Sequence, residues 1–152
     1  MFKQYTTPAK IAQLAAMEET FVLCDSECDA EHILLGLCTV GVASKILATH
    51  GLSIKKVRQT VSKLKVDKPT LTVVEKVKYK FLSFTAQKPP WTVQGQRVLN
   101  LANQFCSSRS TGTQHLLLGL LSLDEGIVSG VFHAHKIDSE ELKRQLIQAV
   151  EE

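Results

Sequence analysis

The 152-residue chain has no run of roughly 20 unbroken apolar residues, the length that crosses a bilayer. Its first five residues, Met1 to Tyr5, contain no apolar signal core. It also lacks the G-x-x-x-x-G-K-[ST] loop that cradles nucleotide phosphates. Its four cysteines are unevenly placed and do not form the framework of a secreted disulfide-rich domain. We therefore expect a cytoplasmic protein with no membrane partner, no cofactor and no ATP binding of the phosphate-loop type.

Most of the chain also lacks an excess of positive charge, although the formal net charge is +3. Residues 65–90 contain six lysines and two acids, a charge of +4, so the rest of the chain carries −1. A nucleic-acid-binding domain would place Lys and Arg along a folded face. This distribution argues against a nucleic-acid partner.

The same basic segment, residues 65–91, contains three of the four prolines. Residues 72–81 within it are rich in β-branched and aromatic side chains, which suits a short strand, an ordered crossover or a mobile loop equally well. We interpret 65–91 as an irregular spacer and expect it to be the most mobile or most divergent region.

Two seven-residue stretches organise the rest of the chain. Residues 31–37 read EHILLGL and residues 114–120 read QHLLLGL, so the one substantial difference is Glu31 against Gln114. Matching segments flank both stretches in the same order, with glycines in register. The sequence thus predicts one domain over residues 1–152, in which repeat one (6–64) and repeat two (92–150) are joined by the spacer.

Each repeat has the periodicity and the caps of four helices. In repeat one, Thr6 or Thr7, Asp29 and Ser53 suit helix starts, and Gly51 suits a helix stop. The first helix shows an apolar stripe at helical spacing, formed by Ile11, Leu14, Ala15, Val22 and Leu23. Gly36 and its counterpart Gly119 indicate close helix–helix approach. The prediction is an all-α fold of about eight helices in two pseudo-twofold-related four-helix repeats.

The repeated heptapeptides, together with Thr6-x-x-Ala9 and the pair Glu18-Glu19, resemble the Clp N-terminal (Clp repeat) domain family, ClpC type. The resemblance implies a chaperone-associated interaction module rather than an enzyme, which docks adaptors or substrate polypeptides for an AAA+ unfoldase in ATP-dependent proteolysis. The alternative is a free-standing accessory subunit that binds and stabilises the ClpP peptidase core, as plastid relatives do. A plant or algal origin would place the protein in the plastid stroma. We expect a monomer in isolation.

The same resemblance implies a phosphoarginine-like ligand site in each repeat. In the first, Glu31 would hold the guanidinium and Thr6 the phosphate, since a carboxylate matches a guanidinium fork and a helix N-terminus suits an anion. In the second, Thr92 is present but Gln114 replaces the acid, which makes that site degenerate. The simpler alternative is that Glu31 only complements the dipole of its helix.

Aromatic residues near the start of each repeat suggest a second kind of contact. Phe2, Tyr5 and Trp91 resemble residues that form a hydrophobic peptide-binding surface in the family. Tyr5 and Trp91 could equally staple the starts of their helices to the core.

Cys24, Cys28 and His32 are spaced by four, as metal ligands on one helix face would be. However, a structural zinc site needs four ligands, and the polar residues 25–29 are expected to break the helix. The sequence therefore predicts no metal site.

Overall fold

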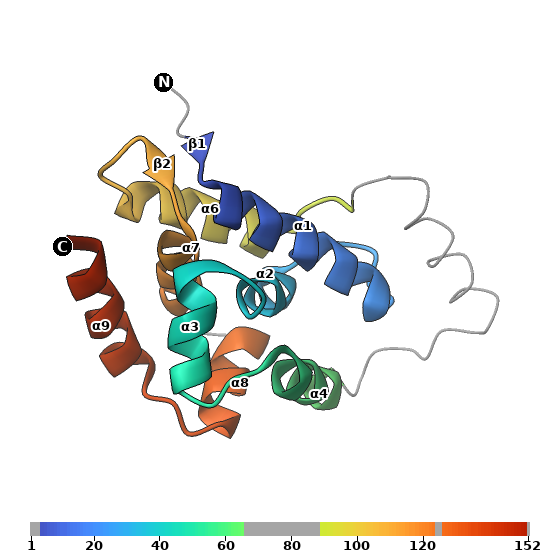
Figure 1. Cartoon of the computed structure of the whole chain (residues 1–152). Coiled ribbons are helices and arrows are strands. Elements are labelled where there is room, and N and C mark those ends of the chain that lie inside the picture. Colours follow the sequence, from blue (N-terminus) through green and yellow to red (C-terminus); the bar gives the residue numbers. More distant parts are fainter. Residues whose placement is uncertain (1–3, 66–88, 124–125, 152) are drawn as a thin grey trace.

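The computed structural model describes residues 4–65, 89–123 and 126–151 (Figure 1). Eight helices lie in these ranges: α1 (Thr7–Val22), α2 (Ala30–Leu37), α3 (Gly41–Thr49), α4 (Ile54–Leu64), α6 (Val93–Phe105), α7 (Thr113–Leu121), α8 (Ile127–Ala134) and α9 (Ser139–Glu151). Two short strands, β1 (Gln4–Tyr5) and β2 (Ser110–Thr111), complete the elements. The predicted all-α fold of two four-helix repeats is confirmed, whereas spacer residues 66–88 lie outside the described residues.

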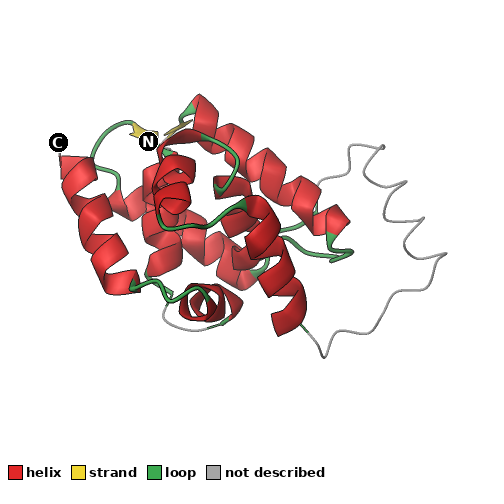
Figure 2. Ribbon diagram, turned by 60° about the horizontal axis from the view of Figure 1, so that its bottom comes forward, coloured by secondary structure: helices red, strands yellow, loops and turns green. Residues whose placement is uncertain are grey.

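The two repeated heptapeptides form the central helices of the molecule. Every residue of α2 is buried, and α7 is buried at all positions except Gln114. The two helices contact each other, and the other helices pack around them (Figure 1). Figure 2 shows the described helices gathered in one cluster. Such near-continuous burial explains why leucine and isoleucine occupy four of the seven positions of each heptapeptide. In the described part of the chain no single helix is long and apolar enough to cross a membrane, and only α2 and α3 taken together, across an 87° bend, reach that length and hydropathy.

Helix α1 lies so close to α2 that only glycine fits at the crossing. A Cβ atom on Gly36 would come 2.1 Å from the carbonyl oxygen of Ala12 and 3.0 Å from the amide nitrogen of Ala16. The small inward side chains of Ala12 and Ala16 permit this contact, and Gly119 makes the equivalent approach to Val98 in the second repeat. The close approach predicted from the repeated glycine is thus confirmed.

The apolar stripe of α1, in contrast, does not face the core. Ile11, Leu14 and Val22 are 45%, 51% and 57% exposed. The core-facing positions of α1 are small or polar instead: Ala9, Ala12, Ala16, Glu19 and Thr20. Apolar periodicity predicts a helix, but it does not determine which side of the helix faces the core. In α1 the tight crossing with α2 requires small side chains on the buried side.

The two repeats exchange the segments that precede their first helices. Strand β1, just before α1, pairs in parallel with β2, just before α7, with Tyr5 opposite Thr111 (Figure 1). The entry to α6 pairs with repeat one in the same way. Trp91, which precedes the helix cap Thr92, forms a parallel bridge with Cys28. Each heptapeptide helix therefore begins beside the chain entry of the other repeat.

The predicted helix caps are present. The hydroxyls of Thr6 and Thr92 accept hydrogen bonds from the N–H groups of Ala9 and Gly95, at 3.2 and 3.0 Å. Asp29 caps α2, and Gly51 adopts a positive φ of 80° after α3. These local choices set where each helix starts and hence where its first-turn side chains lie.

Candidate functional site

A polar pocket lies where the start of α2 meets the entry to α6. Its volume is about 190 Å³. Residues from both repeats line it: Asp25, Ser26, Glu27, Asp29, Glu31, His32, Lys65 and Thr92. Four carboxylates face one ammonium group, so the lining carries a net charge of −3 when the histidine is neutral. Such a pocket favours a cationic ligand.

Lys65, the residue after α4, extends into this pocket. Its ammonium nitrogen lies 2.9 Å from Oδ2 of Asp25 and forms an ion pair with Oε1 of Glu31. The Lys65 side chain is 16% exposed and that of Glu31 is 6% exposed. Because the carboxylates are largely removed from water, pairing with Lys65 offsets much of the cost of burying them.

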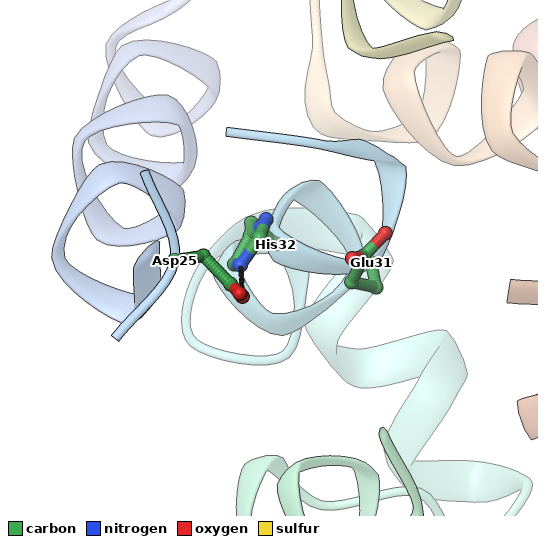
Figure 3. A group of neighbouring side chains, drawn as sticks. All are labelled: Asp25, Glu31 and His32. Atoms are coloured by element: carbon green, nitrogen blue, oxygen red, sulfur yellow. Dashed lines mark hydrogen bonds and ion pairs between the residues drawn. The ribbon is translucent and has the colours of Figure 1, made fainter. Parts of the chain in front are cut away.

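His32 makes two hydrogen bonds that fix one neutral tautomer, and the bond to Asp25 is drawn in Figure 3. Its Nδ1 accepts the backbone N–H of Asp29 at 2.9 Å, so the ring proton must reside on Nε2. Nε2 lies 2.7 Å from Oδ2 of Asp25 and donates to it. Burial lowers the pKa of His32 from 6.5 to about 4. The contact with Asp25 is therefore a hydrogen bond from a neutral imidazole to a carboxylate, rather than an ion pair, at pH 7.

Asp25, Glu31 and His32 place ligand-type atoms within 4.8 Å of one another. The tautomer of His32 works against a metal ion there, because its Nε2 carries the proton and its Nδ1 lone pair is used by Asp29. Burial also raises the pKa of the Cys28 thiol to about 12, so at neutral pH it is not the thiolate that metals bind. Both observations argue against metal binding by these side chains, and the absence of a metal site stays a prediction.

The structure groups the predicted ligand residues across the repeats rather than within them. Glu31 shares its pocket with Thr92, whose hydroxyl donates to Oδ1 of Asp29 at 2.8 Å. Thr6, which we paired with Glu31 from the sequence, instead donates its backbone N–H to the carbonyl of Thr111, just before α7. The exchanged entry segments cause this difference, since each threonine caps a helix that starts beside the other repeat.

Gln114, the counterpart of Glu31, is the second residue of α7. Its side chain folds over its own helix start, where a Cβ on Gly112 would come 2.5 Å from Oε1 of Gln114. His115 repeats the capping role of His32, accepting the N–H of Gly112 at 2.9 Å. The helix start is thus conserved between the repeats, while the carboxylate is not.

Two of the three predicted surface aromatics are described. Tyr5 and Trp91 are partly buried and pack against the hydrophobic core. The hydroxyl of Tyr5 also accepts a hydrogen bond from the side chain of Asn103 at 3.4 Å. Both residues are intermediate in exposure, while Phe2 lies outside the described residues.

Asp25, Asp29 and Lys65 belong to the site but were absent from our sequence-based set. The sequence predicts Asp29 only as a helix cap and Asp25 only as part of the polar residues 25–29. It places Lys65 at the edge of the spacer. Only the cluster of acids in residues 25–31 could have signalled a cation-binding pocket, because nothing local to Lys65 predicts its partner 34 residues earlier in the sequence.

Comparisons with known proteins agree with this fold. No family model matches the chain. The chloroplastic chaperone protein ClpC1 of rice (Oryza sativa subsp. japonica) is 31% identical over 157 residues, which cover 100% of this chain and 16% of ClpC1. The N-terminal domain of ClpD from Arabidopsis thaliana superposes with a TM-score of 0.76 at 18% identity over 96% of both chains. The N-terminal domain of Hsp104 from Candida albicans gives 0.70 at 17% identity, over 97% of this chain and 91% of that one.

Fold and site together define an all-α double-repeat module with a polar pocket at the junction of its repeats. The solved structures share that fold, and the ClpC1 match extends through the whole chain. This chain belongs to the Clp N-terminal domain family. It spans about a sixth of the length of the curated relatives it matches.

Proposed function

We propose that this chain is a protein–protein interaction module of the Clp system, which docks adaptors or substrate polypeptides for an AAA+ unfoldase. The observation that carries this proposal is the pocket shared by Glu31 of repeat one and Thr92 of repeat two. Its groups are four carboxylates, two hydroxyls and a neutral imidazole, beside the ammonium of Lys65. They suit the recognition of a cationic side chain by charge-assisted hydrogen bonds.

Binding assays with the two candidate partners test this function. Tagged chain should retain the AAA+ unfoldase, or the adaptors and substrates of that unfoldase, from its own organism. The alternative function, an accessory subunit of the peptidase core, predicts that the tagged chain retains ClpP when no unfoldase is present. Retention of ClpP alone would replace our proposal with this alternative.

The ligand of the pocket is proposed to carry a guanidinium, and phosphoarginine is the form implied by family resemblance. Glu31 supplies the carboxylate for the guanidinium. The N-terminus of α6, capped by Thr92, supplies the N–H groups that suit a phosphate. A phosphate there would replace the present hydrogen bond between the Thr92 hydroxyl and Asp29.

We expect the two repeats to bind such a ligand unequally. A hydrogen bond to a charged acceptor contributes ~1.5–3 kcal/mol against ~0.5–1.5 kcal/mol for a neutral one. The Glu31 pocket should therefore bind phosphoarginine or an arginine-bearing peptide about tenfold more tightly than the Gln114 region. Titration followed by NMR should show shifts that cluster around Glu31.

Reciprocal variants control this comparison. Glu31→Gln should weaken the first site by about tenfold, and Gln114→Glu should strengthen the second. Shifts that cluster around Gln114, or no shifts at millimolar ligand, would contradict the receptor role. The chain would then dock partners through other surfaces.

A further inference from the structure

The lysine in the pocket belongs to the chain itself, and its position is the one a ligand's cation would need. Nζ of Lys65 lies between Oδ2 of Asp25, at 2.9 Å, and Oε1 of Glu31. Glu31 is the carboxylate proposed to receive a guanidinium. A guanidinium paired with Glu31 would therefore meet the ammonium of Lys65.

We propose that Lys65 is a built-in competitor for this pocket: its ammonium occupies the cation position between Asp25 and Glu31, and an external cationic side chain binds by displacing it. This inference rests on the proposed function, because it concerns the regulation of the same site. It makes Lys65 the residue that sets how tightly a partner's arginine or lysine is held.

The charges of the pocket support displacement rather than a closed structural ion pair. Even with Lys65 seated, four carboxylates face one ammonium, and the lining still attracts a cation. The Lys65 side chain keeps 16% of its surface exposed, so its ammonium can leave toward solvent. Asp25 also keeps its hydrogen bond from His32 when Lys65 departs.

The second repeat lacks both members of the pair. Counting from the helix caps Ser53 and Asp138, position 65 corresponds to Val150, which packs against the core. Gln114 stands where Glu31 would be. The ammonium thus occurs only in the repeat that has the carboxylate, as expected if it competes for that group.

Tethering makes the competition effective. A side chain held a few bonds from its site acts at a local concentration in the millimolar range or above. The apparent dissociation constant is the intrinsic one divided by the fraction of molecules whose pocket is free of Lys65. If Lys65 is seated in roughly nine molecules of ten, an external cation binds about tenfold more weakly than it would to an empty pocket.

The test is an NMR titration with Nα-acetylarginine amide, which carries one guanidinium and no phosphate. We compare the native chain with Lys65→Met, Lys65→Arg and Lys63→Met. Lys63 lies in the last turn of α4, two residues before Lys65, and is exposed, which makes it the matched control. Lys65→Met should bind the probe at least tenfold more tightly than the native chain. Lys65→Arg and Lys63→Met should keep the weak native affinity, and the Lys65 ammonium signal of the native chain should move as probe is added.

Removal of the ammonium takes the ion-pair partner from both Asp25 and Glu31, which could prevent folding. The pair Asp25→Asn and Asp25→Asn/Lys65→Met reduces this cost, because only Glu31 then loses an ion pair and an asparagine oxygen still accepts from His32. The double variant should bind more tightly than the single one. Equal affinity with and without Lys65 overturns the competitor while the pocket remains a receptor. Weaker binding after its removal makes Lys65 part of the receptor and also overturns the proposal. No binding in any variant overturns both the receptor and its competitor.

Discussion

Replacement of Gly36 with alanine is expected to lower the free energy of unfolding by about 3 kcal/mol, a large share of the ~5–15 kcal/mol that holds a domain together. The new methyl carbon would lie 2.1 Å from the carbonyl oxygen of Ala12, which belongs to the backbone of α1 and cannot rotate away. Helices α1 and α2 would have to separate, and α2 is the buried centre of repeat one. Urea unfolding followed by circular dichroism at 222 nm measures the loss.

Gly130→Ala is the matched control for this experiment. Gly130 is also a helical glycine, but its added Cβ would meet only the end of the Leu64 side chain, at 3.0 Å. Alanine is favoured over glycine inside a helix by up to about 1 kcal/mol, so this variant should be as stable as the native chain or more stable. Equal stability of Gly36→Ala and Gly130→Ala would show that the α1–α2 crossing is looser than the structure indicates.

Acid is expected to destabilise the domain through His32. Burial lowers its pKa in the folded state to about 4, whereas the unfolded chain titrates near 6.5. Between these values the unfolded state binds more protons, so stability is complete above about pH 6.5 and falls as the pH decreases toward 4. The expected loss is about 2 kcal/mol at pH 5 and about 3 kcal/mol near pH 4.

Burial is the main reason why protonation of His32 is unfavourable in the folded state, and the hydrogen bond at Nδ1 adds to it. A protonated ring would turn Nδ1 into a donor facing the N–H of Asp29 and would break the cap of α2. The charges of Glu31, Asp29 and Glu19 oppose the lowered pKa, and that of Lys65 reinforces it. Burial outweighs the three acids.

Urea unfolding at pH 7 and pH 5 tests this prediction. His32→Gln should have a lower free energy of unfolding than the native chain at pH 7. Its free energy of unfolding should change much less between pH 7 and pH 5 than that of the native chain. His133→Gln, at an exposed histidine, should keep the native pH dependence. If the native chain is equally stable at both pH values, His32 is protonated at pH 5 in the folded state as well, and its pKa is not lowered.

Much of the fold could be predicted from the sequence, because its signals are local. The heptapeptides at 31–37 and 114–120 revealed the two repeats, and their glycines indicated the tight crossings that the structure contains. Caps such as Thr6, Asp29 and Thr92 are set by a side chain and an N–H group one to three residues away. Interactions of that range can be inferred from the order of residues.

The orientation of α1 could not be inferred in this way. Ile11 and Leu14 recur at helical spacing as well as the alanines do, yet Ala12 and Ala16 face the core. What decides between the faces is the distance to α2, where Gly36 leaves no room for a larger neighbour. That distance is a property of two packed helices.

The sequence by itself determined two helical repeats and placed Glu31 and Gln114 at equivalent helix starts. The tertiary structure decided which threonine accompanies each of them. Repeats within one chain can pair their segments internally or exchange them, and both arrangements satisfy the same local patterns. The exchange of entry segments places Thr92 beside Glu31, and the end of α4 brings Lys65 to the same carboxylate. These contacts span 61 and 34 residues of sequence, and only the packing of the helices brings their partners together.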